Sequence, residues 1–185
     1  PLRKDRTSVH KPILRPEILD AKSRRGDHLL VYQTAEGNAS LADTLQRTGM
    51  ECRVYGMRRN LTEEAVEGNL RYRPFSEEGF IEDLASARGV IAGGGFTLMG
   101  ECVYLHKPML SVPVVHQFEQ VMNARYLAKL GYGRYADSLS DPRVVHDFVA
   151  SLDACEEALG AYHQDGNRLL LEELESLLDR AAAGV

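Results

Sequence analysis

Apolar and polar residues alternate in blocks that predict strands and helices in turn along the chain. Short apolar runs at 28–32 (HLLVY) and 90–92 (VIA) are bounded by polar residues or glycines and predict buried strands. The stretch 77–87 has apolar residues three and four positions apart, which predicts a helix. Because strands and helices alternate, we expect an α/β fold: a Rossmann-like three-layer sandwich with a mostly parallel sheet.

The same patterns divide the rest of the chain. Pro16 predicts the first turn of a short helix after an extended segment. Further strands are predicted at 51–55, 69–72, 109–112 and within 131–135, and further helices at 40–47, 97–105, 119–130, 142–151 and 153–183. The last helix carries one apolar stripe, formed by Leu169, Leu170, Leu174, Leu177 and Leu178. We expect this stripe to pack on its own domain. The alternatives are that part of it is exposed or that it pairs with another copy of the chain, as a homodimer.

Composition excludes several classes of protein. The 185 residues are 44% hydrophobic, which fits one domain with a sizeable core. The net charge is −5 and no large basic cluster occurs, so a nucleic-acid surface is not expected. No apolar run approaches the roughly 20 residues of a transmembrane segment. Cys52, Cys102 and Cys155 lie far apart, which predicts neither a zinc site nor a disulfide framework and suits a cytoplasmic protein.

Three consecutive glycines, Gly93-Gly94-Gly95, separate the predicted strand at 90–92 from the predicted helix at 97–105. Glycine takes positive φ without strain and lets a backbone approach a ligand closely, and we expect both here. The first N–H groups of a helix and its dipole favour an anion. The turn therefore predicts a binding site for a diphosphate, with a plain tight turn as the alternative.

A carboxylate follows inside the predicted helix. Glu101 lies one turn after Thr97, so both side chains project from the same face of the first turns. The helix dipole favours a negative charge there, and a carboxylate accepts hydrogen bonds from both hydroxyls of a ribose. Glu101 is therefore the candidate for ribose binding, and a solvated acid on the helix is the alternative.

These residues occur in a recognisable order: the glycine turn, Glu101, Lys107-Pro108, a strand ending at Pro113, Glu119-Gln120 and Asn123-Ala124. This order resembles the donor-binding motif of the GT-B glycosyltransferases. It is similar to the C-terminal half of the enzyme that adds N-acetylglucosamine to the lipid precursor of peptidoglycan, and to UDP-glucuronosyl and antibiotic glycosyltransferases. Segments 96–101 and 107–113 look closest to a bacterial and archaeal branch of that superfamily. The resemblance covers about residues 26–149.

The resemblance implies how the chain is organised. Residues 1–25 would be an interdomain linker, 26–152 a Rossmann-like donor-binding domain, and 153–185 C-terminal helices packed on that domain. It would be the C-terminal half of a GT-B fold. The resemblance further implies that the N-terminal half, which in the family binds the acceptor and usually supplies the catalytic base, would lie upstream and is missing from this chain. We therefore assign no catalytic residue and expect the chain to be inactive alone.

The resemblance also assigns residues to the parts of a UDP-sugar. The diphosphate-sugar would face a set of loop and backbone groups from Thr34, Gly37, Gly94, Gly95, Phe96 and Thr97. Phe75 stands where an apolar residue packs on the uracil ring in the family, and a core or staple aromatic is an equal alternative. Glu119 and Gln120 stand where sugar hydroxyls are held. His116 is expected to hydrogen-bond the ligand rather than act as a general base.

The predicted function is a nucleotide-sugar-binding domain of a metal-independent, inverting glycosyltransferase that transfers a hexosyl group from a UDP-sugar. No cofactor or metal is expected, since the sequence lacks an Asp-x-Asp pair and preorganised N–H groups would stabilise the leaving diphosphate. No G-x-G-x-x-G follows the first strand, which counts against a dehydrogenase. A UDP-sugar 2-epimerase on the same scaffold and a non-catalytic nucleotide-binding subunit are the alternatives.

Overall fold

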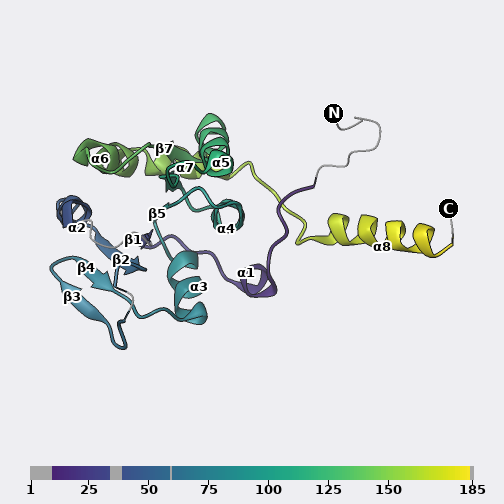
Figure 1. The fold of residues 1–185 in the computed structure, drawn as a ribbon, viewed down its shortest axis with the longest axis horizontal. Helices are drawn as coiled ribbons and strands as arrows, with labels where there is room; N and C mark the ends of the chain where they lie inside the picture. The colour runs from purple at the N-terminus through teal and green to yellow at the C-terminus, as the bar shows by residue number, and fades with distance from the viewer. Residues whose placement is uncertain (1–9, 34–38, 59, 184–185) are drawn as a thin grey trace.

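The computed structural model of the chain describes residues 10–33, 39–58 and 60–183. Within them a seven-stranded sheet forms the centre, and helices cover both of its faces (Figure 1). The strands are β1 (His28–Tyr32), β2 (Glu51–Tyr55), β3 (Ala65–Glu67), β4 (Leu70–Tyr72), β5 (Gly89–Ala92), β6 (Met109–Ser111) and β7 (Gly133–Tyr135). The helices are α1 (Pro16–Asp20), α2 (Ala39–Gln46), α3 (Glu77–Ala85), α4 (Phe96–Tyr104), α5 (Phe118–Lys129), α6 (Pro142–Ala150), α7 (Leu152–Leu159) and α8 (Arg168–Ala182).

The strands lie in the order β3-β4-β2-β1-β5-β6-β7. All neighbouring strands are parallel except β3, which runs antiparallel to β4 at the edge and lies in a stretch predicted to be turns. From β1 the chain first builds toward β2 and later crosses to β5 on the other side. Sheets of this kind bind ligands beyond the carboxyl ends of the strands where the order reverses, here between β1 and β5. The predicted α/β fold is confirmed.

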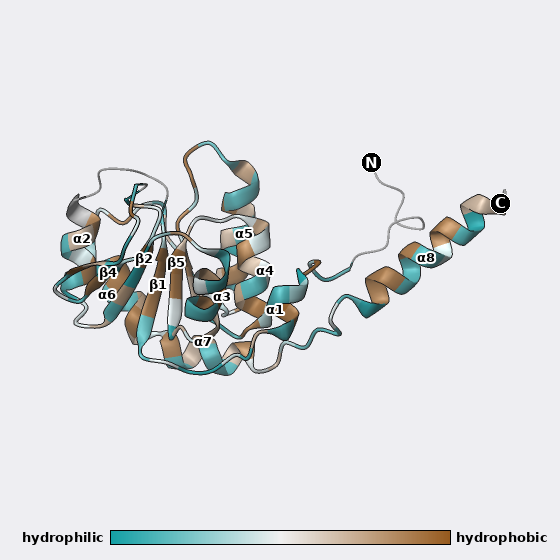
Figure 2. Cartoon of the chain, turned by 90° about the horizontal axis from the view of Figure 1, so that it is seen from below, coloured by the Kyte–Doolittle hydropathy of each residue, from teal (hydrophilic) through white to brown (hydrophobic). Residues whose placement is uncertain are grey.

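Two apolar cores sandwich the sheet because successive side chains of a strand point to opposite faces. Leu30 and Val90 pack with residues of α1, α3, α4 and α5. Leu29, Val31 and Ile91 pack with residues of α2, α6 and α7. Figure 2 shows the resulting band of apolar strands between the helical layers. The predicted three-layer sandwich is therefore present.

The last part of the chain differs from the prediction. Residues 153–183 were expected to be helical, but the chain leaves the helical conformation between α7 and α8, where Gly166 and Asn167 take φ values of 69° and 73°. Helix α7 buries three residues, whereas α8 buries none. Leu178 is 61% exposed, and α8 extends away from the body of the molecule (Figures 1 and 2). The expected packing of this stripe on the domain is therefore wrong.

The segment before the sheet is part of the same body. As predicted, Pro16 opens the short helix α1. Leu14 and Ile18 are almost fully buried in the core beneath α3 and α4. The expected division of the chain at 25 and 152 stays a prediction.

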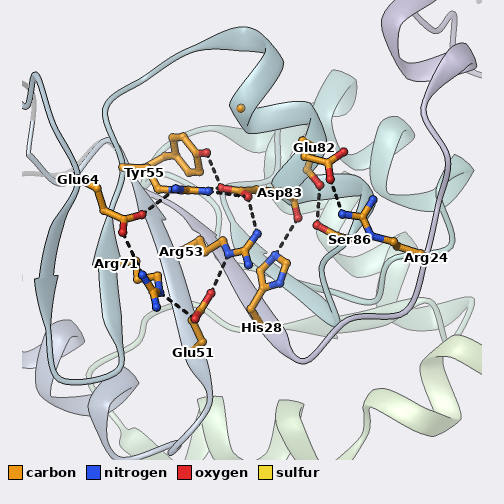
Figure 3. Close-up of polar contacts among 12 residues, drawn as sticks. Arg24, His28, Glu51, Arg53, Tyr55, Glu64, Arg71, Glu82, Asp83 and Ser86 are labelled. Atoms are coloured by element: carbon orange, nitrogen blue, oxygen red, sulfur yellow. Dashed lines mark hydrogen bonds and ion pairs between the residues drawn. The ribbon is translucent and has the colours of Figure 1, made fainter.

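A polar network joins β2, β4 and α3 (Figure 3). The Asp83 carboxylate, 1% exposed, accepts hydrogen bonds from Arg53 Nη1 at 2.6 Å, from Tyr55 Oη at 2.6 Å and from Arg73 Nε at 2.9 Å. Burial by itself raises the pKa of Asp83, but the bonds that it accepts outweigh burial and hold the pKa below its usual value. Because Arg73 starts the loop after β4, the network fixes the backbone that presents Phe75.

Candidate functional site

A pocket of about 370 Å³ opens beyond the carboxyl ends of β1 and β4, beside the first turns of α4. It is lined by Arg15, Tyr32, Phe75, Glu77, Phe80, Thr97, Leu98 and Glu101. The structure thus brings together Phe75, Thr97 and Glu101, which the sequence predicted as site residues. The pocket lies next to the reversal of strand order, where α/β sheets bind ligands.

The carboxylate in this pocket has a cationic partner. Glu101 is 2% exposed, and its Oε1 and Oε2 accept hydrogen bonds from Nε and Nη2 of Arg15 at 2.7 and 3.2 Å. Nη1 of Arg15 donates to Oε1 of Glu77 at 2.5 Å. The hydrogen bond and charge of Glu101 raise the pKa of Arg15 despite partial burial. Glu101 is therefore an ion-paired carboxylate, which excludes the alternative of a solvated helix acid.

The opposite wall of the pocket is aromatic. Phe75 is 68% exposed, and its ring centroid lies 6.3 Å from that of Tyr55 and 6.0 Å from that of Phe80. The rings of Tyr32 and Phe80 meet edge to face, with their centroids 5.5 Å apart. Phe75 is therefore the exposed end of a packed aromatic cluster and not a core residue. Its role toward a nucleobase stays a prediction.

The first turn of α4, which lies beside the pocket and is exposed to solvent, presents backbone N–H groups as hydrogen-bond donors. Gly95 is the N-cap residue, and no side chain caps the helix. Gly95, Phe96 and Thr97 are all exposed. The first N–H groups of a helix have no partner within it, and the helix dipole adds partial positive charge there. This turn is suited to bind an anion.

The three glycines before α4 act differently from the prediction. None has a positive φ, so the expected left-handed conformation is wrong. A Cβ on Gly94 would lie 2.4 Å from the carbonyl oxygen of Gln120, so this glycine lets α5 approach the turn. A Cβ on Gly95 would meet nothing within 4 Å. Gly94 therefore serves the packing, and Gly95 is the glycine that faces open space.

Side chains from the start of α5 hold the glycine turn. Oε1 of Gln120 accepts hydrogen bonds from the N–H groups of Gly94 and Val114, at 3.2 and 3.1 Å. Nδ2 of Asn123 donates to the Gly94 carbonyl at 3.1 Å and to Oε1 of Glu119 at 3.0 Å. Gln120 thus joins the loops that follow β5 and β6. Glu119 is exposed beside them, outside the residues that line the pocket.

Three other predicted residues lie outside the pocket lining or outside the described part of the chain. His116 is exposed on the loop between β6 and α5, with a φ of 68° that is uncommon for a residue other than glycine. Thr34 and Gly37 fall within 34–38, outside the described residues.

Sequence reasoning missed the residues that surround the predicted ones. Tyr32 ends the first predicted strand, and Glu77 starts a predicted helix, so their position in the chain marked them as loop neighbours of the site. Arg15 lies 86 positions from Glu101 in a segment read as a linker, and nothing in its local sequence indicated a contact.

The described residues contain no His, Cys, Asp and Glu groups gathered to hold a metal ion. Their three cysteines are free and buried, and burial raises the pKa of Cys52 to about 11. No helix among them is long and apolar enough to cross a membrane.

Three comparisons with known proteins agree with the fold. The family model described as glycosyl transferase family 1 matches residues 1–153. An uncharacterized glycosyltransferase of Methanopyrus kandleri is 30% identical over 95 residues, which are 50% of this chain and 28% of that protein.

Solved structures give the same result. MurG of Acinetobacter baumannii superposes with a TM-score of 0.63 at 15% identity, over 86% of this chain and 55% of that chain. The spinosyn rhamnosyltransferase SpnG complexed with thymidine diphosphate gives 0.51 at 19% identity, over 82% and 43%. The chain thus spans about a quarter to a half of the length of these relatives. The family match covers most of the chain, and the sheet, its flanking helices and the predicted GT-B resemblance agree with it. The chain therefore belongs to glycosyl transferase family 1.

Proposed function

We propose that the chain binds the nucleotide end of a UDP-linked hexose and serves as the donor-binding part of a glycosyltransferase. The observation that carries the proposal is the convergence of Glu101, Thr97 and Phe75 on one pocket beside the uncapped start of α4. A nucleoside diphosphate needs an apolar surface for its base, an acceptor for its ribose and donors for its phosphates. The pocket offers all three next to one another.

The ligand would lie across this edge of the sheet. The base packs on the exposed ring of Phe75, and the ribose hydroxyls donate to Glu101. The diphosphate binds the N–H groups at Gly95, Phe96 and Thr97. The sugar then extends toward the exposed Glu119 at the start of α5, and the Gln120 amide nitrogen lies on the same helix turn.

The chemistry is transfer of a hexosyl group. A hydroxyl of the acceptor attacks the anomeric carbon from the face opposite the diphosphate, the bond to the diphosphate oxygen breaks, and UDP leaves with the electron pair. The hydroxyl proton goes to a base outside the groups assigned here. Negative charge grows on the departing diphosphate, and the preorganised N–H groups of α4 stabilise it without a metal. Attack from the opposite face inverts the anomeric configuration.

The acceptor would bind a part of the protein beyond this chain. The longer relatives support this proposal, since the matched region is 55% and 43% of the two solved glycosyltransferase chains. The chain alone would therefore bind donor without transferring sugar.

A calorimetric titration of the chain with UDP, UMP, TDP and GDP, with and without chelator, tests the proposal. We expect binding that is insensitive to chelator and stronger for UDP than for UMP, because α4 contributes through the second phosphate. UDP should also exceed TDP, because Glu101 can accept from both hydroxyls of a ribose but from one of a deoxyribose. The neighbour solved with thymidine diphosphate makes TDP the necessary competitor.

Two variants complete the experiment. Glu101→Gln should weaken binding of UDP, and Glu157→Gln, which removes an exposed charge from α7 outside the pocket lining, should not. Absence of binding to every nucleotide, or binding of equal strength in Glu101→Gln and wild type, would contradict the proposal. Formation of a new sugar nucleotide from UDP-N-acetylglucosamine alone would support the epimerase instead.

A further inference from the structure

Segments from near the two ends of the described chain run against each other (Figure 1). We call residues 10–15 and 162–167 together the terminal clasp. Asn167 provides its central contact: Oδ1 accepts from the Leu14 N–H at 2.9 Å, and Nδ2 donates to the Leu14 carbonyl at 2.7 Å. The amide thus satisfies both backbone groups of the residue that precedes Arg15.

Other contacts of the clasp lie on the N-terminal side of Leu14. Nε2 of Gln164 donates to the Pro12 carbonyl at 2.7 Å, and its Oε1 accepts from Tyr162 Oη at 2.7 Å. Nζ of Lys11 lies 5.2 Å from the centroid of the Tyr162 ring and donates to the His163 carbonyl. The segment is therefore held through the side chain of Lys11 and through backbone groups of Pro12 and Leu14.

The clasp is also held against the helix of the site. A Cβ on Gly100 would lie 2.9 Å from Cβ of Pro12, so the segment packs directly on α4 one residue before Glu101. Leu14 is 3% exposed in the core beneath α3 and α4. Arg15 follows at once and makes its two bonds to Glu101. One continuous set of contacts thus leads from Asn167 to the pocket.

We propose that Asn167 is a positioning residue for nucleotide binding, which acts through Leu14 and Arg15 on the carboxylate of Glu101. This rests on the proposed function, because it assumes that Glu101 receives the ribose. A carboxylate has about four acceptor positions, and Arg15 uses one on each oxygen. The remaining positions serve the two ribose hydroxyls while the two bonds from Arg15 fix the direction of the buried carboxylate. The ligand adds to the ion pair and does not replace it, because a buried carboxylate without its counter-ion is strongly disfavoured.

The conformation of Asn167 allows a clean substitution. Its φ is 73°, a conformation that glycine adopts without strain. Asn167→Gly therefore removes both side-chain bonds to Leu14 and keeps the backbone. Asn167→Asp keeps the acceptor for the Leu14 N–H and loses the donor to its carbonyl. Arg168→Gln is the matched control, because Arg168 is exposed at the start of α8 and its guanidinium forms ion pairs with Glu172 and Asp165.

Titration of these variants of the 185-residue chain with UDP tests the proposal. Asn167→Gly should weaken UDP binding about 3- to 10-fold, the effect of one or two hydrogen bonds. Asn167→Asp should lie between it and wild type, and Arg168→Gln should match wild type. A double-mutant cycle distinguishes this role from a general loss of stability. In the Glu101→Gln background, Asn167→Gly should have no further effect on UDP affinity.

The outcomes separate the two proposals. If wild type binds UDP and Glu101→Gln weakens it while Asn167→Gly leaves it unchanged, the role of Asn167 is wrong and the proposed function stands. Equal losses from Asn167→Gly in both backgrounds, or tighter binding in Asn167→Gly, also overturn this role. If wild type binds no nucleotide, both proposals fail.

Discussion

The guanidinium of Arg15 binds both oxygens of the Glu101 carboxylate, with Nε 2.7 Å from Oε1 and Nη2 3.2 Å from Oε2. These residues are 86 positions apart. The contact links the segment that precedes the sheet to the helix that follows the glycine turn. A carboxylate held in this way is a directed acceptor, and this gives the ribose assignment a sharp test.

Glu101→Gln should weaken UDP binding by about 1–3 kcal/mol, because hydrogen bonds to a charged acceptor become bonds to a neutral amide. The informative comparison is with the 2′,3′-dideoxy analogue of UDP. Wild type should bind this analogue less tightly than UDP, whereas Glu101→Gln should discriminate little between them. A variant that still prefers UDP by the wild-type factor would show that other groups bind the diol.

The glycine turn offers a matched pair of substitutions. Gly94→Ala would place a Cβ 2.4 Å from the Gln120 carbonyl oxygen, so the turn and α5 must separate. We expect a loss of about 1–3 kcal/mol in the free energy of unfolding, as for other overpacked sites. Urea unfolding followed by circular dichroism measures it.

Gly95→Ala is the second member of the pair and should separate binding from stability. Gly95 has φ −62° and ψ 130°, which alanine adopts freely, and its Cβ would meet no atom within 4 Å. The free energy of unfolding should therefore stay within about 1 kcal/mol of wild type. The new methyl group faces the proposed diphosphate, so UDP affinity should fall. Unfolding at much lower urea would contradict this division of roles.

Asp83 should contribute strongly to the free energy of unfolding, because it joins α3 to β2 and to the loop after β4. Asp83→Asn removes the charge that pairs with Arg53 and Arg73, and we expect a loss on the order of 3 kcal/mol in the free energy of unfolding. Glu82→Gln, its neighbour in an exposed ion pair with Arg24, should change little. The pKa of Asp83 in the folded chain is lowered from its usual value of 3.8. The difference in free energy of unfolding between wild type and Asp83→Asn should therefore be constant above pH 3.8 and shrink as the pH falls below it.

Lys107 gives a second pH dependence, in the alkaline range. The side chain is 4% exposed, Nζ donates to the Arg24 carbonyl at 2.7 Å, and burial lowers its pKa from 10.5 to about 8. Between about pH 8 and pH 10.5 the side chain of Lys107 is protonated in the unfolded chain and has lost its proton in the folded chain. Raising the pH from 8 to 10.5 should therefore stabilise wild type relative to Lys107→Met, by up to about 3 kcal/mol. Urea unfolding of both proteins across this range checks it, and a constant or falling difference would contradict the lowered pKa.

The sheet was predictable because its signals are local. Strands β1 and β2 match their predicted bounds at 28–32 and 51–55. β1 contains a buried apolar run, and in β2 polar residues at 51 and 53 alternate with buried apolar ones, so both patterns are local. β3 was missed because an edge strand of three residues, two of them exposed, carries no such run. The break after α7 begins at Gly160 and includes left-handed backbone at Gly166 and Asn167, which the helical spacing of the apolar residues does not indicate.

The site was predictable only in part, for a related reason. Thr97 and Glu101 share one helix, so their spacing placed them together. The close approach of Gln120 to Gly94 depends on how α5 packs, and the contact of Arg15 with Glu101 depends on segments from distant parts of the chain. The requirement for glycine was therefore recognised, while its physical reason at Gly94 was not.

The position of Gln120 has a consequence for ligand polarity. A side-chain amide has one oxygen and one nitrogen, and here the oxygen serves the N–H groups of Gly94 and Val114. The amide therefore cannot rotate by half a turn to suit a ligand without releasing two loops. A ligand that contacts the free end of this side chain meets a hydrogen-bond donor, so it must offer a hydrogen-bond acceptor. The two loops that hold the Gln120 oxygen thus also determine that this side chain offers a ligand a hydrogen-bond donor and not an acceptor.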